Sequence, residues 1–195
     1  MPKVFSDEER AYIDKRLREE AAYCLMTFGV KGTTVDELVK RVNIPKGTFY
    51  LFYDSKESLL FQALLTLHEQ MEQTLFKRIG DLPDKRDVEA VTDVVLELYV
   101  MADRSGLLRM MTTGELEIIY RKLPVDSFQG HLEHDSDTIR TIFNMLNIST
   151  DNIDHYAAAF RSQFITMIYK REMGEDKVFA ALRLCIRGLI LQMFE

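Results

Sequence analysis

The stretch that most constrains the fold covers residues 33–56 and reads TTVDELVKRVNIPKGTFYLFYDSK. Thr34 suits a helix N-cap, because its hydroxyl can accept a hydrogen bond from a backbone N–H that the first turn leaves free. Asn43 suits the end of that helix, since asparagine tolerates a left-handed backbone. Pro45 suits the first turn of a next helix, where its missing N–H costs nothing. The stretch therefore predicts two short helices joined by a tight turn.

The second of these helices, about residues 45–52, has an outer face suited to DNA. Phe49 is expected to point inward, together with Phe52 or Tyr53. The residues left outside are Lys46, Gly47, Thr48, Tyr50 and Leu51. They combine a positive charge, a hydroxyl, a phenol and a bare backbone position, so the helix can enter a major groove. Lys46 and Thr48 are expected to reach base edges, Gly47 to allow close backbone approach, and Tyr50 to reach a phosphate.

A long third helix is expected to begin after Ser55, with Lys56 in its first turn. A lysine at a helix N-terminus opposes the helix dipole, and a phosphate at the same place would explain it. We therefore assign phosphate contacts to Lys56 and Thr34 as well. A three-helix packing unit without DNA is the alternative, but packing alone does not require an exposed Lys-Gly-Thr-x-Tyr. The predicted DNA-binding residues are Thr34, Lys46, Gly47, Thr48, Tyr50, Leu51 and Lys56.

The same segment closely resembles the helix-turn-helix of the tetracycline-repressor (TetR) family. The matching residues are Phe28-Gly29, Gly32, Thr33-Thr34-Val35, Leu38, Gly47-Thr48-Phe49-Tyr50 and Ser55-Lys56-Glu57-Ser58-Leu59. The match covers about the first third of the chain, and many fixed spacings coincide. Leu51 and Phe52 depart from the commoner pattern, in which an aromatic residue and a histidine or tyrosine stand. The resemblance implies a DNA-binding domain followed by a body that pairs with a second copy.

Composition favours an all-α protein. The 195 residues are 47% hydrophobic and include only four prolines and nine glycines, which suits packed helices. We expect about nine or ten helices: a three-helix helix-turn-helix domain over residues 1–54 and a larger helical regulatory and dimerisation domain over residues 55–195. The first 60 residues hold ten basic and ten acidic side chains, so the net charge of −6 falls on the remainder. An acidic body limits non-specific binding to nucleic acid.

Two C-terminal helices are predicted over residues 151–173 and 175–195, and they meet at Gly174. Their apolar faces are wider than one neighbour needs, which indicates a second partner surface. Two helices joined by a short turn can pair with their copies as a four-helix interface, and the family resemblance implies the same arrangement. The candidate contacts of this homodimer are Phe160, Phe164, Phe179, Ile186 and Ile190.

Flexible and aromatic side chains gather in the body, together with a few polar groups. Methionine is adaptable and polarizable, so such residues can line a pocket for an apolar ligand. Plain core packing is the alternative for most of them. The candidate pocket residues are Met101, Arg104, Met110, Met111, Tyr120, Phe143, Phe160 and Phe164. The expected effector is a small, largely apolar molecule, and no cofactor is expected.

Other signals are weak. His131 and His134 could share a helix face, but no third fixed ligand accompanies them, so no metal site is predicted. No nucleophile elbow or phosphate-binding glycine loop is present, so an enzyme is not expected. Cys24 and Cys185 are interpreted as buried thiols of a reducing cytoplasm. No apolar signal core or membrane-length apolar window is found, so we expect a cytoplasmic protein without a membrane partner.

These observations predict a one-component transcriptional regulator. It would be a ligand-responsive repressor that binds a near-palindromic operator in double-stranded DNA as a homodimer. The alternative is a small-molecule carrier or enzyme whose N-terminal helices are only structural.

Overall fold

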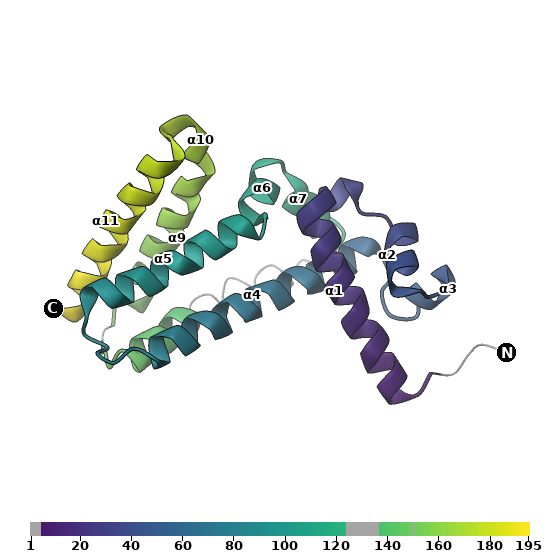
Figure 1. Cartoon of the computed structure of the whole chain (residues 1–195), viewed down its shortest axis with the longest axis horizontal. Helices are drawn as coiled ribbons and strands as arrows, with labels where there is room; N and C mark the ends of the chain where they lie inside the picture. Colours follow the sequence, from purple (N-terminus) through teal and green to yellow (C-terminus); the bar gives the residue numbers. More distant parts are fainter. Residues whose placement is uncertain (1–4, 124–136, 150) are drawn as a thin grey trace. The chain divides into compact units, whose positions relative to one another are not determined.

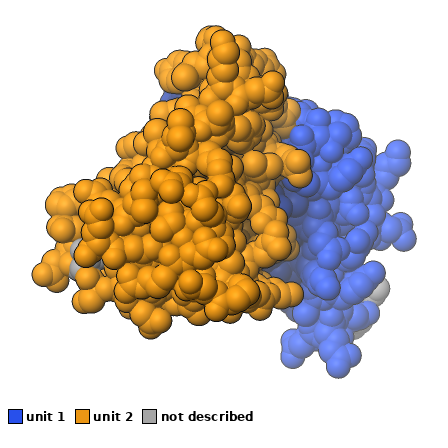
Figure 2. Space-filling view, turned by 60° about the vertical axis from the view of Figure 1, so that its left-hand side comes forward, with its two compact units in different colours: residues 1–69, 110–125 blue, residues 70–109, 126–195 orange. Residues whose placement is uncertain are grey.

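The computed structural model describes residues 5–123, 137–149 and 151–195. The regular structure of these residues is entirely helical, which confirms the all-α prediction (Figure 1). The chain divides into two compact units (Figure 2). Unit 1 contains residues 1–69 and 110–125, and unit 2 contains residues 70–109 and 126–195. The predicted functional division at residues 54 and 55 stays a prediction.

Unit 1 begins with α1 (Asp7–Gly32). Ser6 and Glu9 form a capping box, with Glu9 N donating to Ser6 Oγ at 3.1 Å and Ser6 N donating to Glu9 Oε2 at 2.8 Å. Gly29 interrupts the helical backbone with φ 72° and ψ −177°, a conformation that residues other than glycine rarely adopt. The buried stripe of α1 includes Ile13, Leu17, Ala21, Cys24 and Leu25.

The next two helices of unit 1 form the predicted helix-turn-helix. They are α2 (Val35–Val42) and α3 (Lys46–Phe49). Thr34 caps α2 by accepting from Glu37 N at 3.2 Å, and Asn43 ends it in a left-handed conformation with φ 59°. Both local predictions are therefore confirmed. The turn closes where Ile44 N donates to Val39 O at 3.0 Å.

The long helix α4 (Lys56–Gly80) begins after Ser55, whose hydroxyl accepts from Ser58 N at 3.1 Å. The boundary between units 1 and 2 falls inside α4, between Glu69 and Gln70. The short helices α6 (Leu107–Thr112) and α7 (Glu115–Tyr120) follow later in the chain. In unit 1, α7 packs against α1, and a Glu115 carboxylate oxygen lies only 2.6 Å from where a Gly29 Cβ would stand. A side chain at position 29 would therefore collide with Glu115.

Unit 2 is built on α5 (Val88–Arg104), α9 (Ile153–Thr166) and α11 (Glu175–Phe194), with η1 (Met167–Tyr169) and α10 (Lys170–Met173) between the last two. Asp87 caps α5 by accepting from the backbone N–H groups of Glu89 and Ala90 at 2.9 and 3.1 Å. Helix α11 packs against α5 and α9, and residues 137–145 are also helical. Gly174 separates α10 from α11, as predicted.

Tyr99 is buried in unit 2, and its phenol has a hydrogen-bond partner. Tyr99 donates its hydroxyl proton to the Phe160 carbonyl oxygen at 2.8 Å. Burial raises the pKa of Tyr99 above its usual value. The structure corrects one expectation, because Cys24 is buried but Cys185 is exposed. None of the described helices is both long and apolar enough to span a bilayer.

Candidate nucleic-acid interface

Two buried aromatic side chains fix α3 in unit 1. Phe49 and Tyr53 are both buried, as the sequence predicted for Phe49. Their rings lie 6.2 Å apart, and Tyr53 N donates to Phe49 O at 3.1 Å. Phe52 is half-buried, and its ring lies 6.4 Å from that of Phe5. Aromatic side chains therefore anchor α3 to unit 1, while Lys46, Gly47, Tyr50 and Leu51 are exposed.

Lys46, Gly47, Tyr50 and Leu51 form this outward surface, which we call the α3 face. Tyr50 is 51% exposed and Leu51 is 54% exposed, both high values for large apolar or aromatic side chains. A Cβ added at Gly47 would meet nothing within 4 Å, so the Gly47 backbone is open to a partner. The α3 face therefore offers a cation, a phenol and a bare backbone position side by side.

Thr48 does not belong to the α3 face. The side chain was expected outside, but the residue is only 8% exposed. A one-turn helix carries so few residues that its rotation depends on what packs beneath it. In this structure Thr48 turns toward the interior beside Phe49, so direct base contact by the Thr48 hydroxyl would require a rearrangement.

Lys46 is held by an acidic side chain of α2. Lys46 Nζ lies 2.9 Å from Asp36 Oδ1 and donates to Asp36 Oδ2 at 3.0 Å. This hydrogen bond raises the pKa of Lys46 above its usual value, so the amine stays protonated at neutral pH. The sequence reasoning missed Asp36. The close approach of the α2 N-terminus to the α3 N-terminus in a helix-turn-helix is the signal that could have revealed it.

Lys56 has a structural role that the sequence did not reveal. Lys56 Nζ donates to the carbonyl oxygens of Val30 and Thr33 at 2.7 Å each. These carbonyls lie at the C-terminal end of α1, where a cation interacts favourably with the helix dipole. A lysine in the first turn of α4 is thus explained without a phosphate. Thr34 is exposed beside it, with its hydroxyl engaged as the α2 cap.

A polar cluster joins α1 to Tyr53, in the turn that follows α3. Tyr53 donates its hydroxyl proton to Asp14 and accepts from Arg18 Nε at 3.1 Å, while Arg18 Nε also donates to Asp14 Oδ2 at 2.9 Å. Burial and the Asp14 carboxylate raise the pKa of Tyr53 to about 12. All three groups satisfy one another, so the cluster fixes the position of Tyr53 relative to α1.

Arg41 makes a second brace between α1 and α2. Its guanidinium lies 4.8 Å from the centre of the Tyr23 ring and 5.7 Å from that of Phe28. Its Nε donates to Glu37 Oε1 at 2.7 Å, and Nη1 lies 3.6 Å from Glu20 Oε2. Arg41 is thus committed to contacts within unit 1, which leaves Lys46 as the exposed cation of the α3 face.

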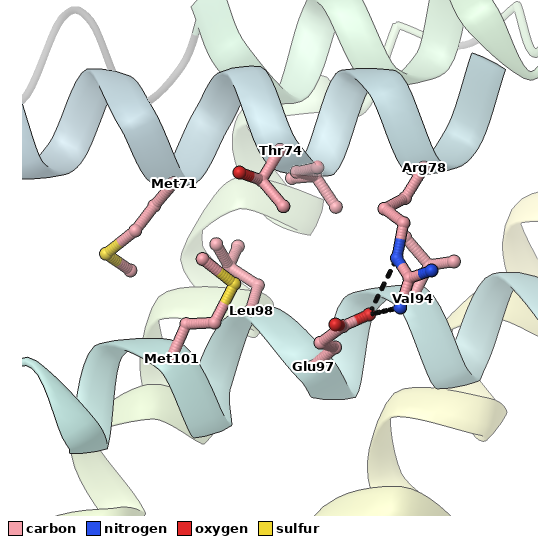
Figure 3. Close-up of a pocket in the computed structure, with 8 residues that line it drawn as sticks. Met71, Thr74, Arg78, Val94, Glu97, Leu98 and Met101 are labelled. Atoms are coloured by element: carbon pink, nitrogen blue, oxygen red, sulfur yellow. Dashed lines mark hydrogen bonds and ion pairs between the residues drawn. The ribbon is translucent and has the colours of Figure 1, made fainter. Parts of the chain in front are cut away.

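A hollow in unit 2 lies between α4 and α5 (Figure 3). It is small and open to solvent, with a cavity volume of about 10 Å³. The apolar side chains of the two helices point toward each other in the close-up, and the Arg78–Glu97 ion pair stands at one end of the hollow. Arg78 Nε donates to Glu97 Oε2 at 2.9 Å. The lining residues are Met71, Thr74, Leu75, Arg78, Val94, Glu97, Leu98 and Met101.

The predicted pocket residues are not gathered around this hollow. Only Met101 belongs to its lining. Met110, Met111 and Tyr120 belong to unit 1, where Tyr120 packs against Phe61 with ring centres 6.1 Å apart. The predicted residues that belong to unit 2 but not to the lining are Arg104, Phe143, Phe160 and Phe164. Phe143 and Phe160 are buried in the core and Phe164 packs against Tyr99, while Arg104 is exposed.

The outward side of α11 differs from the predicted one. Ile186 is 0% exposed and Ile190 is nearly as buried, so both pack inside their own chain. Leu184, by contrast, is 73% exposed. Phe160 is buried, while Phe164 and Phe179 are half-buried. The exposed apolar and small residues of α11, which we call the α11 outer stripe, are Ala180, Ala181, Leu184, Cys185, Gly188 and Leu191.

No candidate metal centre is found in the part of the chain that the structure describes, where no three His, Cys, Asp or Glu side chains gather. His131 and His134 lie outside the described residues.

The fold and the α3 face define the class of protein: an all-helical chain with an N-terminal helix-turn-helix. A family model described as bacterial regulatory proteins, tetR family, matches residues 17–63. This match includes most of α1, all of α2 and α3, and the start of α4. Residues 17–63 of this chain therefore form a helix-turn-helix domain of the tetR family of bacterial regulatory proteins.

Similar proteins include two HTH-type transcriptional regulators of Bacillus subtilis strain 168, both described as uncharacterized. YhgD is 33% identical over 84 residues, which cover 43% of this chain and 44% of YhgD. YuxN is 26% identical over 166 residues, which cover 80% of this chain and 53% of YuxN. The chain spans about half the length of the curated relatives it matches. A TetR-family transcriptional regulator from Pectobacterium atrosepticum shares the fold, with a TM-score of 0.69 at 19% identity over 95% of this chain and 97% of that one.

Proposed function

We propose that this protein is a transcriptional repressor that binds a near-palindromic operator as a homodimer and responds to a small ligand. The observation that carries the proposal is the α3 face, with its exposed Lys46, open Gly47 backbone and exposed Tyr50. A helix of this kind reads base edges in a major groove while neighbouring groups contact phosphates. The match to this family supports the same conclusion.

The roles of the predicted DNA-binding residues follow from their surroundings. Lys46 reads base edges, the Gly47 backbone approaches the groove, and Tyr50 and Thr34 contact phosphates. Leu51 adds an apolar contact, of the kind that a thymine methyl group accepts. Lys56 acts through the end of α1 and Thr48 acts through packing, because both are already engaged inside unit 1.

The homodimer is proposed to form through the α11 outer stripe. An exposed leucine beside small residues is typical of a helix that packs against a copy of itself. Gly188 carries no side chain and Leu184 is strongly exposed, so a second α11 could approach closely at this level. Ile186 and Ile190 would support the interface from the core side.

The effector is proposed to enter the hollow between α4 and α5. Its apolar lining suits an apolar ligand, and Arg78 and Glu97 offer a polar end. Its cavity volume of about 10 Å³ is far below the roughly 300–1,000 Å³ of most ligand sites, so a ligand would bind only by pushing α4 and α5 apart. Because α4 continues into unit 1, the displacement would be passed on to the helix-turn-helix. A coupling of about 1–3 kcal/mol would lower DNA affinity roughly 5- to 150-fold.

Selection of duplexes from a randomised pool, followed by fluorescence anisotropy at several salt concentrations, tests the proposal. The wild-type chain should enrich a near-palindromic sequence. Lys46→Ala should cost about 1–3 kcal/mol at one position of each half-site. Lys15→Ala, which removes an exposed lysine of α1, is the matched control and should bind normally. A wild-type chain that enriches no sequence would overturn the proposal.

Two further measurements separate the parts of the proposal. Leu184→Glu should give monomers in light scattering and lose operator binding, while Tyr12→Glu, another exposed apolar position, should do neither. Calorimetry with a stabilising ligand found by thermal-shift screening should show weaker binding when operator is present. Equal ligand affinity with and without operator would exclude that ligand as the effector.

A further inference from the structure

The ion pair between Asp36 and Lys46 places a hydrogen-bond acceptor beside a donor on the surface that is proposed to meet DNA. Asp36 lies in the first turn of α2, and Lys46 is the first residue of α3. Lys46 Nζ lies 2.9 and 3.0 Å from the two Asp36 carboxylate oxygens. The side chains are 75% and 51% exposed, so both can reach a partner without unfolding.

Folding alone gives little reason for this pair. An exposed ion pair contributes little to stability, because water and salt screen it. Asp36 already interacts favourably with the N-terminal end of the α2 dipole. On a surface that approaches phosphates, however, a carboxylate is unfavourable. Asp36 therefore has a consequence for recognition, because it would weaken any docking that rests on phosphate contacts alone.

The pair matches the edge of one kind of base pair. In the major groove, guanine presents N7 and O6 as acceptors, and the N4 amino group of its cytosine is the adjacent donor. Lysine is a common partner of guanine O6 and N7, and aspartate can accept from cytosine N4. An ammonium held beside a carboxylate thus mirrors the O6 and N4 groups. A phosphate offers only acceptors and would leave Asp36 repelled.

We propose that Asp36 is a specificity-determining residue that, together with Lys46, reads one G·C base pair in each half-site. This inference rests on the proposed function. An A·T pair also presents a donor beside an acceptor, but it gives Lys46 a single acceptor next to the thymine methyl group. Guanine offers the ammonium two acceptors, so G·C is the preferred pair.

The experiment compares Asp36→Ala, Lys46→Ala and Asp54→Ala with the wild-type chain. Asp54 is the matched control, because it is an exposed aspartate directly after Tyr53 and its removal leaves the Asp36–Lys46 pair intact. Each variant is used to select duplexes from the same randomised pool. Affinity for an unselected duplex is measured at several salt concentrations, and circular dichroism monitors helix content.

The wild-type motif should contain a G·C pair that both Asp36→Ala and Lys46→Ala cease to select and that Asp54→Ala retains. Asp36→Ala should also bind the unselected duplex more tightly, so its ratio of specific to non-specific affinity should fall about 5- to 150-fold, the range of one good base contact. Its salt slope should steepen by about 0.9 for each phosphate that the released ammonium gains.

Each contrary outcome has a distinct meaning. If Asp36→Ala selects the wild-type motif with the same affinity ratio as Asp54→Ala, the inference is overturned and the proposed function stands. If Asp36→Ala loses helix content, its binding data cannot be interpreted, and Lys46→Ala becomes the variant that tests the inference. The position that Lys46→Ala loses must then be G·C, and loss of an A·T position or of none would overturn the inference. If the wild-type chain enriches no motif, the proposed function fails and this inference fails with it.

Discussion

Units 1 and 2 differ in the polar contacts that hold their helices together. In unit 1, polar side chains reach inward to fixed partners: Lys56 bonds two backbone carbonyls and Tyr53 bonds Asp14 and Arg18. In unit 2, α5 and α11 pack through buried apolar side chains. The polar contacts between them are surface ion pairs, among them Arg183 and Arg187 with Glu89. Contacts to fixed backbone groups tolerate little movement, whereas exposed ion pairs exchange readily with water. The difference suits a surface that must stay rigid in unit 1 and helices that can separate in unit 2.

The largest expected effect comes from removing one buried ring in each unit. Phe49→Ala and Phe143→Ala should each cost about 3–5 kcal/mol, because both rings are almost fully buried. If the two units unfold separately, thermal unfolding followed by circular dichroism will show two transitions, and each variant will lower a different one. A single transition lowered equally by both variants would mean that the chain unfolds as one cooperative block, and the comparison would lose its energetic basis.

A smaller effect is expected from Lys56→Met, which keeps the apolar stem and removes the charge. Loss of two charge-assisted hydrogen bonds and exposure of unpaired carbonyls should cost about 1.5–3 kcal/mol. Urea unfolding should show a lower midpoint for Lys56→Met, while Lys15→Met, at a lysine that is 75% exposed, should leave it unchanged. Equal midpoints for the two variants would contradict the role assigned to the Lys56 ammonium.

Tyr53→Phe should cost about 1.5 kcal/mol at neutral pH, the lower end for hydrogen bonds to charged groups, because Asp14 and Arg18 are partly exposed. The effect should depend on pH, because burial and Asp14 raise the pKa of Tyr53 from 10.0 to about 12. The folded state favours the protonated phenol, so this contribution is complete below pH 10 and is lost between about pH 10 and 12. Urea midpoints across that range should converge for wild type and variant. Tyr12→Phe, at an exposed tyrosine, should show no such convergence.

The sequence predicted local structure well because local chemistry decides it. Thr34, Asn43 and Ser55 end or begin helices through bonds to residues a few positions away. The partner of Lys56 could not be found in this way, because Val30 is 26 positions distant and belongs to another helix. The rotation of α3, which turns Thr48 inward, likewise depends on what packs beneath that single turn.

Helical periodicity also left the direction of the apolar faces undetermined. The pattern in α11 correctly predicts a long helix, but two apolar stripes share it, and periodicity does not say which one the same chain covers. Ile186 lies on the covered stripe and Leu184 on the exposed one. The pocket residues were dispersed for a similar reason, since methionine and phenylalanine serve core packing and ligand sites equally well.

The smallest expected effect concerns the α5–α11 ion pairs. The hydrogen bond from Arg187 holds the pKa of Glu89 below its usual 4.5. The ionised carboxylate therefore stabilises the fold above that pH, and this contribution is lost as the pH falls through the lower folded pKa. Glu89→Gln should flatten the acid side of a plot of Tm against pH slightly, and Glu172→Gln, at an exposed glutamate of α10, should not. Identical acid branches for wild type and Glu89→Gln would show that these ion pairs contribute nothing to stability.

The Lys56 contact has a mechanical consequence for α4. At about 1.5 Å per residue, the 25 residues of α4 make a rod roughly 36 Å long. Its first residue is tied through one ammonium nitrogen to two carbonyl oxygens at the end of α1, so this end of α4 can act as a pivot. A tilt of a few degrees would move the far end by about 2 Å while changing the Lys56 distances only slightly. The contact therefore fixes where α4 begins without fixing the direction in which its far end points.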